Sequence, residues 1–147
     1  MRKILLFWKL SAPGKKIFLE VFFLSIYTAF LLRNDRNHHK IKAILGRPPA
    51  ANDADAQPGP EERRTVTLAG SAIQTVAKYT PWRNVCYHQA LQARLLLGRR
   101  GIPLNVYIGF RKNAQGKIEG HAWTTCRGRM ITGFCNADEY TVLSEFQ

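Results

Sequence analysis

The sequence predicts an α+β fold, with helices first and an antiparallel sheet after them. Two changes of pattern carry this prediction. Apolar residues recur at helical spacing as far as Gly98, and after Gly101 they alternate with polar residues as in a half-buried strand. The chain has 147 residues, 46% of them hydrophobic, which is enough for one domain with its own core.

The N-terminal part of the chain is apolar and basic. Residues 3–10 and 15–33 are predicted helices, and Ser11 and Pro13 between them suit the start of the second one. That helix is apolar nearly all round, which predicts burial on several sides. Its apolar run includes Glu20 and is shorter than the about 20 residues that cross a bilayer. We therefore expect a buried or interfacial helix, and we recognise no signal peptide.

One segment has the composition of a flexible linker. Residues 47–64 are rich in proline, alanine and acidic residues and lack apolar periodicity. The predicted division of the chain is an N-terminal helical segment (1–46), this linker (47–64) and a core (65–147).

Two helices are predicted at the start of the core. The first covers residues 65–78 and ends before Pro81, because a residue that precedes proline avoids the helical conformation. The second begins near Cys86 and ends at Gly98. Helical spacing places His88 and Gln92 away from its inward stripe, and we expect His88 at the surface. The stripe itself consists of Cys86, Ala90, Ala93 and Leu97.

The alternating part of the chain predicts four strands. They cover residues 104–110, 117–125, 129–132 and 140–146, with a turn between the first two at 113–116. Alternation in the second strand places His121, Trp123 and Thr125 on one face of the sheet.

Cys86 and His121 are the candidate catalytic residues. A thiol acts as a nucleophile in its thiolate form, which a helix N-terminus or a neighbouring imidazole stabilises. Cys86 stands at a predicted helix start, and His121 can serve as base toward it if the sheet packs on that helix. The other interpretation is that both are ordinary core residues. His121, Cys126 and Cys135 match no common zinc spacing, so we expect neither a metal nor another cofactor.

The core resembles a known family in the order and spacing of several short motifs. These are TPWRNVC (80–86), QAL (89–91), LLL (95–97), RRGIP (99–103), Ile108-Gly109, Arg111 and HAW (121–123). They resemble the lasso peptide biosynthesis B2 proteins, related to the C-terminal domain of the microcin J25-processing protein. These are leader peptidases with a transglutaminase-like, papain-related cysteine protease fold. The likeness runs from about Lys78 to the C-terminus, and more weakly upstream to Leu45-Gly46.

The resemblance implies that Cys86 is the nucleophile and His121 the general base and acid. The family has an aspartate about twelve residues after the histidine, whereas this chain has Gly133 there. Three interpretations are open: a Cys–His dyad suffices, Asn136 or Asp138 replaces the aspartate, or a backbone carbonyl orients the imidazole. Asp138 is our candidate because it is the only aspartate after His121. Trp82 and Trp123 are expected to surround the pair, either as substrate-binding walls or as core aromatics.

The resemblance also implies partners. The expected substrate is a lasso precursor peptide, cleaved between leader and core before a cyclase closes the macrolactam. A separate B1-type protein would recognise the leader, and the basic N-terminal helices could contact it, the cyclase or a membrane surface. Although the net charge is +12, no nucleic-acid-binding motif accompanies it, and we expect no nucleic acid partner.

We expect a cytoplasmic protein, peripheral at most to the inner face of the membrane, because three cysteines suggest free thiols in a reducing compartment. The alternative function is a catalytically weakened scaffold that binds the leader or bridges pathway partners, which the missing aspartate favours.

Overall fold

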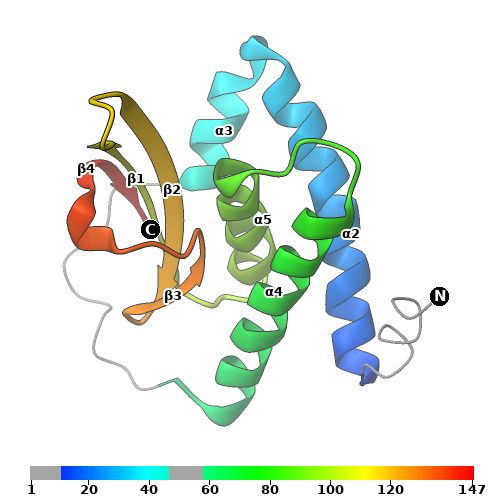
Figure 1. Ribbon diagram of the computed structural model, residues 1–147. Coiled ribbons are helices and arrows are strands. Elements are labelled where there is room, and N and C mark those ends of the chain that lie inside the picture. The colour runs from blue at the N-terminus through cyan, green and yellow to red at the C-terminus, as the bar shows by residue number, and fades with distance from the viewer. Residues whose placement is uncertain (1–10, 47–57) are drawn as a thin grey trace.

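The computed structural model describes residues 11–46 and 58–147, apart from the side chain of Asp35. Helices lie together on one side and an antiparallel sheet covers them on the other (Figure 1). The α+β fold predicted from the sequence is confirmed. The helix expected over residues 3–10 lies outside the described residues, as does most of the predicted linker. In chain order the elements are α2 (Ala12–Arg33), η1 (Asp35–Asn37), α3 (His38–Leu45), α4 (Pro60–Tyr79), α5 (Cys86–Gly98), β1 (Asn105–Lys112), β2 (Ile118–Cys126), β3 (Arg129–Thr132), η2 (Ala137–Glu139) and β4 (Thr141–Phe146).

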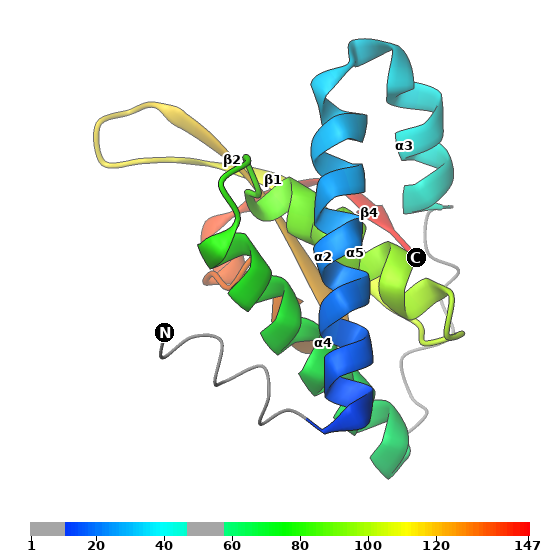
Figure 2. The same ribbon diagram turned by 90° about the vertical axis from the view of Figure 1, so that its right-hand side faces the viewer.

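Helix α2 is buried on one face and exposed on the other. It lies along α4 and α5, and the β1–β2 hairpin projects well beyond the helices (Figure 2). The expectation of burial on several sides is therefore wrong for the outer face. Within the described residues, no helix has the length and apolar character needed to cross a membrane. The exposed apolar residues of this outer face are Leu19, Phe23, Ile26, Tyr27 and Phe30.

Helix α4 begins at Pro60, earlier than the predicted Thr65. Proline fits the first turn of a helix because its missing N–H would have no partner there, and Glu61 and Glu62 interact favourably with the positive end of the helix. The last part of the predicted linker is thus helical. Its acidic, proline-containing composition marks a helix start rather than a flexible segment.

The helices and one sheet edge enclose a common hydrophobic core. Val21 from α2, Ile73 from α4 and Leu96 from α5 are fully buried in the same cluster, and Ile131 from β3 joins them. Burial of such side chains stabilises the fold by roughly 1.5–3 kcal/mol each. Helix α2 is therefore part of the same core as α4, α5 and the sheet.

The sheet has the strand order β3-β2-β1-β4, and neighbouring strands are antiparallel. All four strands predicted from alternation are present. Val106 and Ala122 lie toward α5, in one cluster with its Ala90. Since successive side chains point to opposite faces, His121 and Trp123 lie on the other face of the sheet.

Candidate active site

Cys86 is the first residue of α5. Val85 precedes it in an extended conformation and provides no side-chain cap, and no acidic residue stands in the first turn. The backbone N–H groups at this end lack intrahelical partners and carry partial positive charge, which attracts anionic groups. Cys86 itself is half-buried with a free thiol. This is a favourable place for a nucleophilic sulfur.

Packing places Cys86 near the segment that contains His121. Cys86 packs against the cluster that includes Ala122, the residue directly after His121. Burial raises the pKa of the Cys135 thiol, which lies two residues after Gly133, the residue that contacts His121.

His121 is oriented by a backbone carbonyl. Its Nε2 lies 2.9 Å from the carbonyl oxygen of Gly133, which can only accept, so Nε2 carries the proton in this hydrogen bond. In the neutral imidazole, Nδ1 is then the acceptor and is available as a base. The ring packs against both Trp123 and Tyr140, with centroid distances of 6.2 and 5.3 Å, and these two rings also contact each other. Packing and hydrogen bonding together fix the ring.

Gly133 approaches β2 too closely for any side chain. It has a φ of 66°, and a Cβ at this position would lie 2.1 Å from the carbonyl oxygen of Ala122 and 2.8 Å from Trp123 Cα. The position where the resembled family has aspartate thus contributes its main chain to His121 instead.

Neither the Asn136 carboxamide nor the Asp138 carboxylate, the two side chains proposed to replace the family's aspartate, makes a hydrogen bond with His121 in the described part of the chain. Asp138 is exposed and makes no hydrogen bond or ion pair with the described part of the chain. Asn136 is also exposed, and its Nδ2 donates to Glu139 over 3.3 Å. The third interpretation drawn from the sequence, a carbonyl that orients the imidazole, describes the geometry observed at His121.

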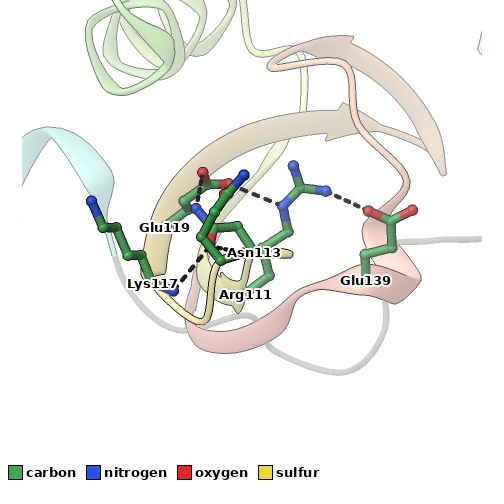
Figure 3. A network of polar contacts seen from close by, with 6 residues as sticks. Arg111, Asn113, Lys117, Glu119 and Glu139 are labelled. Atoms are coloured by element: carbon green, nitrogen blue, oxygen red, sulfur yellow. Dashed lines mark hydrogen bonds and ion pairs between the residues drawn. The ribbon is translucent and has the colours of Figure 1, made fainter.

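The segment that holds Gly133 crosses the sheet from β3 to β4, and we call residues 133–140 the crossing segment. Arg111 of β1 binds Glu139 at its far end and Glu119 of β2 on the other side (Figure 3). The same guanidinium lies over the Tyr140 ring, 5.1 Å from its centroid. Arg111 thereby holds Tyr140 against His121. No motif in the sequence marks Tyr140 for this role, and its only sequence signal is its place at the start of a predicted strand.

Cys86 and His121 lie at the same end of the α5–β2 layer without a hydrogen bond between them in the described structure. The thiol packs toward the helical side of the sheet, whereas the imidazole belongs to the opposite face. Proton transfer between them therefore requires these side chains to move toward each other when substrate binds.

A buried polar network holds the chain just before Cys86. Gln92 is completely buried, and its Nε2 donates to Asn84 Oδ1 over 2.9 Å and to Thr28 Oγ1 over 3.0 Å. Gln89 Nε2 donates to the carbonyl of Asn84 over 3.1 Å. The network ties α5 and α2 to the residues that precede the nucleophile.

The surface position expected for His88 is wrong. His88 is only 7% exposed, because α2 packs against this side of α5. The sheet packs against a different side of the same helix. Burial, and secondarily the nearby Arg83 charge, lowers the pKa of His88, so its imidazole is neutral at pH 7.

A pocket of about 690 Å³ lies between α2 and the start of α5, and Cys86 is not among its lining residues. Its lining includes Val85 and Tyr87, the sequence neighbours of Cys86, and also Trp82. Trp123 is elsewhere: it is 2% exposed and stacks on Tyr107 at a centroid distance of 5.4 Å. Of the two expected substrate-wall tryptophans, only Trp82 lines a pocket, and Trp123 is a core aromatic.

The third cysteine belongs to the helical core. Cys126 is buried in the cluster of α2, α4 and α5, on the opposite sheet face from His121. The described residues contain no group of three or more histidine, cysteine or acidic side chains placed to hold a metal ion.

A model of the transglutaminase-like superfamily matches residues 28–145. The match begins within α2 and ends in β4, so it includes Cys86, the sheet and the crossing segment. No curated protein and no solved structure matches the chain.

Proposed function

Because the chain belongs to the transglutaminase-like superfamily, which includes cysteine proteases and transglutaminases, we propose that it is a cysteine endopeptidase. The observation that carries the proposal is Cys86, on an uncapped helix N-terminus, with its sequence neighbours lining the 690 Å³ pocket. His121, whose Nδ1 is left available by its bond to Gly133, is the proposed base, and substrate binding would have to bring it to Cys86.

The chemistry follows from these groups. His121 Nδ1 takes the proton of the Cys86 thiol, and the sulfur attacks the carbonyl carbon of the scissile bond. The N–H groups of the first turn of α5 can donate to the oxyanion that forms. Collapse breaks the C–N bond, and the imidazolium gives its proton to the leaving amine. Water then attacks the thioester, losing a proton to His121, and releases the carboxylic acid and the thiol.

The proposed substrate is the leader–core junction of a ribosomally made lasso precursor. The support is the motif resemblance, from TPWRNVC at 80–86 to HAW at 121–123, together with the superfamily match over the same residues. A separate leader-recognition protein would bring the precursor to the site, and a cyclase would use the new amino terminus. The exposed outer face of α2 is a candidate contact for these partners.

The test is mass spectrometry of a lasso precursor incubated with the full chain and its recognition protein. We expect a single cut between leader and core by the wild-type chain. The Cys86→Ala variant should make no cut, although its melting temperature should be unchanged. Comparable cleavage by the Cys86→Ala protein would exclude Cys86 as nucleophile.

The scaffold function is the second candidate. The observation that favours it is the absence, within the described residues, of both a Cys86–His121 hydrogen bond and a carboxylate on His121. An electrophilic peptide aldehyde or vinyl sulfone separates the two: an endopeptidase forms a covalent adduct at Cys86, and a scaffold binds the peptide reversibly.

A further inference from the structure

The 690 Å³ pocket has an unusual balance of polar groups. It lies between the second half of α2 and residues 82–88, and its floor is largely apolar, with Ile26, Phe30 and Val85 among the lining residues. Two arginines, Arg33 and Arg83, stand in the same lining and both are exposed. No lining residue is acidic. An occupant therefore meets positive charge with no counter-charge from the pocket itself.

The buried polar atoms of the pocket residues also lack partners. His88 is more than nine-tenths buried, and its Nδ1 has no hydrogen bond with the described residues. The Nε1–H of Trp82, which can only donate, is buried without an acceptor as well. An unpaired buried donor such as the Trp82 Nε1–H is destabilising, so a ligand that supplies an acceptor is favoured here.

We propose that this pocket is a substrate subsite for a bulky apolar side chain next to an aspartate or glutamate. The apolar side chain packs on Ile26, Phe30 and Val85, and the carboxylate interacts with Arg83 and Arg33. Trp82 and His88, which hold the unpaired polar atoms, line the same pocket. The inference deepens the proposed function, on which it rests, because Val85 and Tyr87, the sequence neighbours of Cys86, line the pocket.

The two arginines explain why the pocket would bind an acidic residue more tightly than a neutral or basic one. Guanidinium groups bind carboxylates through paired hydrogen bonds, and a partly desolvated pair is stronger than a fully exposed one. A glutamine in the same place keeps the shape but loses the charge. A lysine is repelled by both arginines. Selectivity at this subsite is thus chiefly electrostatic, whereas the apolar floor provides affinity.

The experiment measures binding separately from catalysis. Isotope-labelled full chain carrying Cys86→Ala is titrated by NMR with an acetylated and amidated hexapeptide, Gly-Gly-Leu-Glu-Gly-Gly. The comparison peptides carry Gln in place of Glu or Ala in place of Leu. The glutamate peptide is expected to shift signals of Trp82, Arg83 and His88, with a Kd at least about fivefold below those of both comparison peptides.

Charge-reversed variants provide the matched control. Arg83→Glu should remove the preference for the glutamate peptide, and Arg64→Glu should retain it, since Arg64 is an equally exposed arginine on α4 outside the pocket. Equal affinity for the Glu and Gln peptides, or shifts confined to other regions, overturns the proposal.

The two proposals fail separately. If the glutamate peptide binds selectively but the wild-type chain and its recognition protein cut no precursor, the subsite is supported and the endopeptidase function is not. If precursor is cut while the Glu and Gln peptides bind alike, the endopeptidase stands and the subsite is wrong.

Discussion

At the scale of single residues, the main departure from the resembled family is the way His121 is held. A carbonyl fixes the ring tautomer as well as a carboxylate does, but as a neutral group it stabilises the imidazolium less. The sequence alone left three interpretations open at Gly133. Neither its left-handed backbone nor its close approach to Ala122 has a local sequence signal beyond the glycine itself.

Restoring the aspartate should damage the fold. Gly133→Asp is expected to lower the free energy of unfolding by about 3 kcal/mol, since it adds a Cβ into Ala122 and strains the backbone. Gly128→Asp is the control, because Gly128 has a similar φ of 75° with nothing within 4 Å of its Cβ position. That variant should cost about 1 kcal/mol. Urea unfolding gives both values, and equal losses would contradict the close approach.

The three thiols should differ in reactivity. Burial is the main cause that raises the pKa of both Cys126 and Cys135, so both have less thiolate at pH 7 than an ordinary cysteine. Iodoacetamide at pH 7 should alkylate Cys86 at least about tenfold faster than either. Labelling of Cys126 and Cys135 should rise as the pH approaches their raised pKa values. Peptide mapping by mass spectrometry measures each rate, and preferential labelling of Cys135 would contradict this order.

At the scale of elements, the periodicity of apolar residues predicted where the helices and strands lie in the sequence. It did not predict which other elements pack against each of them. The inward stripe of α5 was predicted correctly at Ala90, Ala93 and Leu97, which are fully buried. Gln92 and His88 are buried too, because α2 packs on a side of α5 that an isolated amphipathic helix would expose to water. A contact between segments 64 residues apart, such as Gln92 with Thr28, has no local sequence signature.

The Gln92 network should matter for stability and for the position of Cys86. Gln92→Leu keeps the volume but leaves Asn84 and Thr28 without their donor, at an expected cost of about 2–3 kcal/mol. Gln89→Leu removes a half-buried bond to a backbone carbonyl and should cost about 1 kcal/mol or less. Urea unfolding ranks the two, and hydrogen exchange should show faster opening of residues 82–86 in Gln92→Leu. A cost for Gln92→Leu no larger than that for Gln89→Leu would contradict the role of the network.

At the scale of the whole molecule, the N-terminal third is structural as well as exposed. Val21 and Leu24 belong to the common core, so α2 cannot be a detachable appendage. Its opposite face carries Phe23 and Phe30, which are 65% and 74% exposed. A sequence that is apolar all round a helix does not reveal which face remains uncovered, since burial depends on where α4 and α5 pack. The exposed face is where the structure offers a surface to a partner.

Phe23 provides the test of that surface. It lines a groove of about 460 Å³ with Leu19, Tyr27 and Arg99, away from Cys86 and the 690 Å³ pocket. Phe23→Asp should change the melting temperature by no more than about 2 °C, because the side chain is mostly exposed. The same variant should reduce the stimulation of precursor cleavage by the recognition protein at least about tenfold. Ile118→Asp is the control, since Ile118 is 74% exposed next to the turn of the projecting hairpin and far along the chain from α2. It should change neither quantity.

The same pair of variants separates a protein partner from a membrane. Sedimentation with vesicles of phosphatidylglycerol measures lipid binding directly, and a partner surface predicts that Phe23→Asp leaves this binding unchanged while it lowers stimulated cleavage. If Phe23→Asp instead loses vesicle binding while stimulated cleavage stays intact, the outer face of α2 binds the membrane surface. Its apolar side chains beside Lys16 and Arg99 suit an anionic interface.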